Sequence, residues 1–143
     1  MAENRCKDTN DDSLFVKGGY GEVRFAVSKT GFNIARKGLL KLNSKKTKKK
    51  TFVLFKVILI HWAKTGQFTK TKKDDNSVLY PKIIRIKPKD AHLLRLTFFY
   101  KKNKRVCYLT SIYKKGSKKQ NNEALKKADD ARKEHEMIMG TEV

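Results

Sequence analysis

The sequence predicts an α+β fold in which an antiparallel sheet packs against two N-terminal helices, with a third helix at the C-terminal end. Two observations predict this fold. Apolar and polar residues alternate in four short stretches, which is typical of half-buried strands. Apolar residues recur at helical spacing between the first and second of these stretches, and again after the fourth. The expected order is therefore one strand, two helices, three strands and a terminal helix.

The chain is expected to form a single domain. Its 143 residues, 38% of them hydrophobic, are enough for one core and too few for two. Residues 1–13 include four acidic side chains and have no apolar periodicity, so a disordered acidic leader is expected there. The folded domain is expected to cover residues 14–143.

The first strand is predicted at Glu22–Ser28, where Val23, Phe25 and Val27 alternate with polar residues. Gly18, Gly19 and Gly21 precede this strand rather than a helix. They therefore lack the context of a phosphate-binding loop and indicate a flexible lead-in.

Two helices are predicted next. The first is capped by Ser28 or Thr30, and Gly38 weakens it by about 1 kcal/mol relative to Ala. Its apolar positions are Phe32, Ala35, Leu39 and Leu42. The second runs from Thr51 to Gly66. Its β-branched residues suit a strand, but its length is ordinary for a buried helix and too long for a strand.

Three more strands are predicted at 82–87, 93–100 and 105–112, with the last two joined as a hairpin through 101–104. Alternation assigns one face to the helices, with Ile84, Ile86, Leu94, Leu96, Phe98, Val106, Tyr108 and Ile112. The other face receives Arg85, Lys87, Arg95, Thr97, Ser111 and Tyr113, together with Leu93, Phe99, Cys107 and Leu109. This second face is basic and partly apolar, so an element or partner is expected to shield part of it.

The chain ends in a predicted helix at Glu123–Glu136, in which Asp129 and Lys133 form a favourable ion pair one turn apart. Between the last strand and this helix, Tyr113–Glu123 is predicted to form a basic turn. Lysines at the end of a rigid strand are presented to a ligand instead of being dispersed on a mobile tail.

The charge of the chain points to a polyanionic partner. The 35 Lys and Arg residues exceed the 14 Asp and Glu residues and give a net charge of +21. A folded domain tolerates such repulsion best when a polyanion relieves it, so nucleic acid is the leading partner class.

Metal, disulfide and membrane chemistry find little support. The two cysteines and three histidines have no spacing typical of a zinc site or a catalytic triad, and no small-molecule cofactor is expected. The longest apolar run, 52–62, is about half the length that spans a bilayer, and no signal-peptide pattern opens the chain. A cytoplasmic protein without a membrane partner is expected.

Three stretches resemble successive elements of the RelE/ParE superfamily of bacterial type II toxins, and most of all its HigB-like, phage-derived branch. EVRFAVSKTGFNIARKGLLKL is similar to the family's first strand and helix, and FVLFKVILIHWAKTG to its second helix, which ends in Gly. KIIRIKPKDAHLLRLTFFYKKNKRVCYLTSIYKKGSKKQNNEALKKADDARKEHE is similar to its later strands, its Lys-Lys pair and its Glu- and Ala-rich helix. The resemblance covers about residues 22–136.

The resemblance implies a RelE-like fold and an endoribonuclease, an mRNA interferase, that cuts messenger RNA on the ribosome and is held inactive by a cognate antitoxin protein. The implied chemistry needs no metal. The 2′-hydroxyl next to the scissile phosphate is deprotonated and attacks in line, and the 5′-oxygen is protonated as it leaves. Positive side chains hold the phosphate and stabilise its extra charge in the transition state.

Family positions imply the site residues. Lys87 would approach the 2′-hydroxyl and Arg95 the scissile phosphate, while Lys115 would contact the phosphate or protonate the leaving oxygen. Tyr113 or His92 would replace the general acid or base that some relatives carry near the last helix, and an unperturbed imidazole titrates in the useful range. The residues expected to bind RNA without taking part in the reaction are Arg85, Lys89, Lys114, Lys118 and Lys119.

Other interpretations stay open. Arg85, Lys87 and Arg95 would alternatively form a solvated outer sheet face, and Lys114 and Lys115 would attract phosphate without catalysis. The chain would then be a ParE-like toxin that binds DNA gyrase, or a non-catalytic basic module for nucleic acid. We prefer the ribonuclease because Lys87, Arg95 and Lys115 are expected to converge on one face, which a gyrase binder does not require.

Overall fold

The computed structural model describes residues 13–28, 31–32, 34–44, 49–68, 71–72, 79–88, 94–101 and 105–140. Six strands form one sheet in the order β1-β2-β8-β7-β6-β5. Their bounds are β1 Leu14–Lys17, β2 Glu22–Phe25, β5 Thr71–Lys72, β6 Ile84–Pro88, β7 Leu94–Tyr100 and β8 Val106–Lys114. A separate two-stranded sheet pairs β3 Val27–Ser28 with β4 Gly31–Phe32. The helices are α2 Ile34–Ser44, α3 Lys49–Thr65 and α4 Lys118–Met139.

The α+β prediction is confirmed, with one correction to the sheet. β2 pairs with β8 in parallel, whereas the other neighbours in the sheet are antiparallel. The sheet is therefore mixed rather than antiparallel throughout. The helical segment α2 and α3 separates β2 from the later strands in sequence, which leaves enough chain for a parallel crossover.

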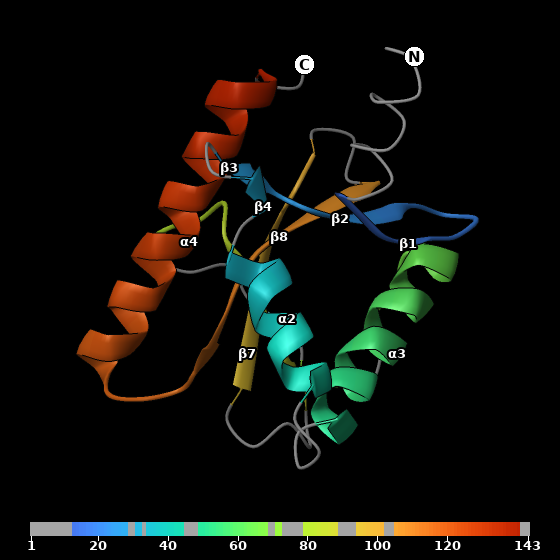
Figure 1. The fold of residues 1–143 in the computed structure, drawn as a ribbon, viewed down its shortest axis with the longest axis horizontal. Helices are drawn as coiled ribbons and strands as arrows, with labels where there is room; N and C mark the ends of the chain where they lie inside the picture. Colours follow the sequence, from blue (N-terminus) through green and yellow to red (C-terminus); the bar gives the residue numbers. More distant parts are fainter. Residues whose placement is uncertain are drawn as a thin grey trace.

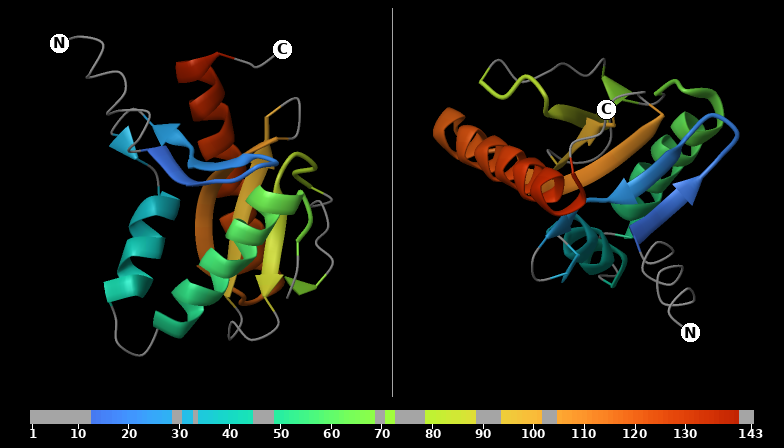
Figure 2. Two further views of the ribbon diagram at one scale, coloured as in Figure 1. Left: turned by 90° about the vertical axis from the view of Figure 1, so that its right-hand side faces the viewer. Right: turned by 90° about the horizontal axis from the view of Figure 1, so that it is seen from above.

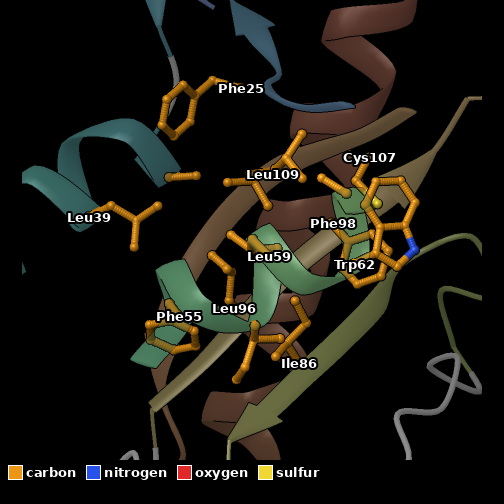
Figure 3. Packing of buried hydrophobic residues seen from close by; sticks show 14 of the residues in the cluster. Phe25, Leu39, Phe55, Leu59, Trp62, Ile86, Leu96, Phe98, Cys107 and Leu109 are labelled. Carbon is orange, nitrogen blue, oxygen red and sulfur yellow. The ribbon is translucent and has the colours of Figure 1, made fainter. Parts of the chain in front are cut away.

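The helices lie on both sides of the sheet (Figures 1 and 2). On one side, α2 and α3 cover a large apolar cluster, in which Leu39, Phe55, Leu59 and Trp62 point toward strand residues such as Leu96 (Figure 3). On the other side, α4 covers a smaller cluster that contains Ala26, Ile83, Phe99, Leu125 and Ala128. Within the described chain, no helix is long and apolar enough to cross a membrane.

β1 is a strand that the sequence pattern did not predict, and glycines form the turn that joins it to β2. β1 and β2 form a hairpin whose turn lies against the end of α3: the backbone N–H groups of Tyr20 and Gly21 donate to the Ala63 carbonyl at 2.8 and 2.9 Å. A Cβ at Gly18 would lie 2.5 Å from the same carbonyl oxygen, and one at Gly21 would collide with the Arg105 carbonyl. The predicted flexible lead-in is therefore a tight turn, because only glycine permits this approach.

The first predicted strand and helix have different bounds in the structure. The strand expected at 22–28 is divided at Ala26 into β2 and β3, which belong to different sheets. The first helix begins at Ile34 rather than after Ser28 or Thr30, because β3 and β4 take up the intervening chain. Within α2, a Cβ at Gly38 would collide with the side chain of Ile112, so this glycine permits close contact between helix and sheet.

The second helix and the later strands lie close to their predicted positions. α3 begins two residues before the expected cap Thr51 and ends next to Gly66, whose φ of 81° suits glycine. β7 and β8 pair as the expected hairpin. Thr71–Lys72, for which no strand is predicted, pairs with β6 as the edge strand β5.

The face assignment of β8 is wrong in the first half of the strand. Thr97 pairs with Ser111 whereas Phe98 pairs with Leu109, so Thr110 is an extra residue in β8. Such a bulge shifts the alternation of side chains by one position. Cys107 and Leu109 consequently face α2 and α3, and Tyr108 faces α4, which is the reverse of the prediction.

Candidate nucleic-acid interface

Three residues expected at the site lie side by side on the α4 side of the sheet. Arg95 of β7 pairs with Tyr113 of β8, and Lys87 of β6 comes directly after the pair of Ile86 with Leu96, which sets Lys87 opposite Arg95. Ile86 and Leu96 belong to the cluster under α2 and α3. Side chains alternate between the faces of a sheet, so the neighbouring residues point to the other face. Lys87, Arg95 and Tyr113 therefore form a row across three strands.

The residues of the row are only partly covered by their neighbours. Lys87, Arg95 and Tyr113 are all half-buried. Tyr113 packs against the cluster around Leu125, and Nη1 of Arg95 donates to the Leu94 carbonyl at 3.0 Å. Packing along the stem of a long side chain restricts its motion while leaving its charged end near solvent. A ligand at this end of the sheet would meet partly ordered cations.

A second row lies one step further along the same face. Arg85 pairs with Thr97, and Thr97 with Ser111. The Thr97 hydroxyl lies 2.7 Å from the Thr110 hydroxyl and 2.6 Å from that of Ser111, and all three residues are buried. These hydroxyls satisfy one another, which a buried polar group requires. The network fixes the β8 bulge next to the row that contains Tyr113.

The predicted basic turn is shorter than expected, because α4 begins at Lys118 and not at Glu123. Ser117 caps the helix: its hydroxyl accepts from the Gln120 backbone N–H at 3.1 Å, while the Gln120 side chain accepts from the Ser117 N–H at 3.0 Å. Asn121 also binds both backbone groups of Gly116. The link between β8 and α4 is therefore held in place, and Lys118 and Lys119 belong to the first turn of the helix.

A groove of about 650 Å³ lies between the end of β8 and one flank of α4. Tyr113, Lys114 and Lys115 line it from the strand and the link, while α4 contributes Gln120, Glu123, Ala124 and Lys127. Lys114 and Lys115 are exposed, and so are Lys118 and Lys119 on the helix. No ion pair within the described ranges engages any of these four lysines. Their charges are available to an anionic ligand.

The expected site residues thus fall into two adjoining sets. One set is the sheet face with Arg85, Lys87 and Arg95, and the other is the lysine-rich link and first turn of α4. Tyr113 belongs to both, since it pairs with Arg95 and lines the groove. Lys89 and His92, two further expected site residues, lie outside the described residues.

His135, near the C-terminal end of α4, has a structural position. Its Nδ1 accepts from the Val27 backbone N–H at 3.0 Å, and its ring centroid lies 4.2 Å from that of Tyr108. The imidazole is buried and connects α4 to β3. The predicted ion pair of Asp129 with Lys133 is present at 3.5 Å.

Several residues that line the site were not predicted from the sequence, because the predicted start of α4 was too late in the chain. Ser117 and Gln120 have the spacing of a capping box, which is the signal that would have located this start. With the helix begun at Lys118, the 3.6-residue period sets Asn122 and Lys126 on the same flank as Lys118. Tyr80, which also lines a hollow beside this flank, carries no comparable signal in the sequence.

The arrangement can bind a phosphate chain through several cations. Across the described residues, no group of three His, Cys, Asp or Glu side chains is placed to hold a metal ion. Comparisons with protein-family models, curated proteins and solved structures found no match for the chain. The geometry of the site and the charge of the chain therefore carry the functional argument.

Proposed function

We propose that this protein is the toxin of a type II toxin–antitoxin system, a metal-independent endoribonuclease that cleaves messenger RNA on the ribosome. The observation that carries the proposal is the row of Lys87, Arg95 and Tyr113, which adjoins the exposed lysines at the end of β8. Cations and a phenol on one face suit a reaction in which a phosphate gains negative charge and protons move at two oxygens.

In the proposed reaction each group has one task. Water takes the proton from the 2′-hydroxyl, the ammonium of Lys87 stabilises the oxyanion that forms, and that oxygen attacks the adjacent phosphorus. Arg95 neutralises the phosphate as it gains charge. The bond from phosphorus to the 5′-oxygen breaks, and that oxygen takes a proton from Lys115 or Tyr113. The products are a 2′,3′-cyclic phosphate and a free 5′-hydroxyl.

A ribosomal setting agrees with the charge of the chain. The net charge of +21 is far larger than one phosphate site requires. Cations spread over a surface raise the rate of encounter with a large polyanion, and the ribosome offers RNA around the bound message.

The proposed antitoxin would be an acidic partner. No acidic residue occurs between Glu22 and Asp74, so α2 and α3 carry none. The exposed face of α3 presents Val53 and Val57 among Lys49, Lys56 and Lys64. An amphipathic segment with acidic residues around an apolar stripe has the chemistry to cover this face.

The test compares cleavage of a translated message by primer extension. Arg95→Ala and Lys115→Ala are each expected to lose at least about tenfold more activity than Lys50→Ala, since contacts made in the transition state cost more than diffuse attraction. Lys50 is an exposed lysine of α3, so its replacement matches the charge change of Lys115→Ala far from the proposed site.

Two outcomes would contradict the proposal. Equal small losses in all three variants would leave a binding surface without catalysis. Inhibition of DNA supercoiling by purified gyrase, without message cleavage, would favour the ParE-like alternative. Circular dichroism of each variant at the assay temperature separates lost activity from lost folding.

A further inference from the structure

A second hollow lies on the other flank of the N-terminal turns of α4. Its volume is about 540 Å³, and it is lined by Tyr80, Lys118, Lys119, Asn122, Glu123 and Lys126. The groove beside β8 is lined instead by Gln120, Ala124 and Lys127 of α4, so the two hollows flank the same turns and share Glu123. In Figure 1 this part of the helix is the orange end of α4, next to the link from β8.

Tyr80 is held by the core and not only by its loop. Its carbonyl accepts from the Ile83 backbone N–H at 2.9 Å, and Ile83 is fully buried. The Tyr80 ring is half-buried and packs against the cluster that contains Ile83 and Leu125. The ring therefore meets the hollow in a fixed position, which lowers the entropy lost when a ligand stacks on it.

The chemistry of the lining fits single-stranded RNA. An aromatic ring offers a stacking surface for a base, and lysines beside it attract the phosphates on either side. Asn122 adds an amide that can donate to or accept from a base edge. Duplex RNA fits less well, because its bases are stacked on one another and are withdrawn from an aromatic side chain.

We propose that this hollow is a base-stacking subsite for single-stranded RNA, with the base against Tyr80 and the adjoining phosphates near Lys118, Lys119 and Lys126. The subsite would hold a nucleotide that flanks the cleaved one, since only the first turns of α4 separate it from the groove that Tyr113 and Lys115 line. The inference rests on the proposed function for the identity of the strand, but it concerns binding and not cleavage.

The test measures binding of a fluorescein-labelled, 2′-O-methyl single-stranded RNA of 12 nucleotides by fluorescence anisotropy. The methyl group blocks the attacking hydroxyl, so affinity is read without cleavage. Tyr80→Ala is expected to weaken binding by about 10- to 100-fold, the range for loss of one stacked base. Tyr80→Phe keeps the ring and is expected to stay within about threefold of the unaltered protein.

Charge and stacking are separated by the dependence on salt. Lys118→Ala combined with Lys119→Ala is expected to reduce the steepness of log affinity against log salt by about 1.4, because two phosphate contacts are lost. Tyr80→Ala is expected to leave that slope unchanged. The matched control is Lys49→Ala combined with Lys50→Ala, which removes two exposed charges from α3 and is expected to change the affinity by less than about threefold.

Tyr80→Leu guards against a folding artefact, because it fills the half-buried position without an aromatic face. The same loss of affinity in Tyr80→Leu, with an unchanged thermal melt, supports stacking. Unchanged affinity in Tyr80→Leu or Tyr80→Ala overturns the subsite. Two further ligands test its specificity: a duplex RNA of the same sequence and an oligoglutamate peptide. Duplex RNA that binds as tightly as the single strand, or a peptide affinity that depends on Tyr80 to the same extent, also overturns it. If Tyr80→Leu loses RNA binding while Arg95→Ala still cleaves the message like the unaltered protein, only the proposed nuclease is overturned and the subsite stands.

Discussion

At the scale of single residues, Thr110 decides which side chains of β8 lie near Arg95. It is the extra residue of the bulge, and its hydroxyl is bonded to Thr97 at 2.7 Å. Without the bulge, Tyr108 and Tyr113 would lie on opposite faces, because they are five positions apart and successive side chains alternate between the faces. With it, both pack on the side of α4. Period-two alternation cannot reveal this shift, because the bulge depends on a partner strand.

Loss of the Thr97 hydroxyl is expected to destabilise the protein. Thr97→Val leaves the buried hydroxyls of Thr110 and Ser111 without their shared partner, at a cost of about 1 to 3 kcal/mol in the free energy of unfolding. Urea denaturation measures this cost. Thr65→Val is the control for an exposed hydroxyl, which donates to the His61 carbonyl at 2.9 Å and accepts from the Gln67 N–H at 3.1 Å. Water can replace these partners, so the expected cost is below about 1 kcal/mol. Equal losses in the two variants would show that the buried network contributes no more than exposed hydrogen bonds.

At the scale of elements, the turn between β1 and β2 anchors the edge of the sheet to the end of α3. The Ala63 carbonyl, in the last turn of α3, receives two backbone hydrogen bonds from this turn. The Tyr20 ring also packs edge-on against the Trp62 ring, with 5.6 Å between the ring centroids. From sequence alone, Gly18, Gly19 and Gly21 suggested a flexible segment. Local composition does not show that the backbone of α3 packs closely against them.

Two neighbouring glycines in this turn provide a matched test. Gly18→Ala is expected to cost about 1 to 3 kcal/mol in the free energy of unfolding, because its Cβ would press on the backbone of Ala63 and Lys64. Gly19→Ala meets nothing within 4 Å and is expected to remain within about 0.5 kcal/mol of the unaltered protein. Chemical denaturation of both variants decides the matter, and similar stabilities would contradict the close contact.

The start of α4 is an element that the sequence does specify, although the prediction placed it five residues late. The weak apolar pattern of the first turns favoured a start at Glu123, because Lys118 to Asn122 bury no side chain. The signal lies in Ser117 and Gln120, since capping is local chemistry that needs no tertiary partner. Caps therefore locate this helix where hydrophobic periodicity fails.

At the scale of the whole molecule, the sequence predicts the fold class and the row at the end of the sheet better than the hollows beside it. Arg95 and Tyr113 follow from strand alternation beyond the bulge, which is a short-range rule. The position of Tyr80 depends on the packing of the 79–83 segment against α4. The parallel pairing of β2 with β8 joins two strands that are separated in sequence by α2 and α3. Both are long-range contacts that local patterns do not encode.

The excess charge leads to an expectation for the molecule as a whole. If about six phosphates of a single strand are neutralised, log affinity is expected to fall against log salt with a slope of about −4. That slope corresponds to a loss of about 300-fold between 50 and 200 mM salt. Anisotropy titrations of the 2′-O-methyl RNA over this range measure the slope.

A peptide nucleic acid of the same sequence is the control, because it has bases but no phosphates. Its binding is expected to be weak and nearly independent of salt, since no counterions are released when it binds. An RNA affinity that does not change with salt would mean that the positive charge of the chain, +21 in total, is not directed at phosphates. Equal salt slopes for the RNA and the peptide nucleic acid would lead to the same conclusion, because the salt would then affect the protein and not its contacts with phosphates.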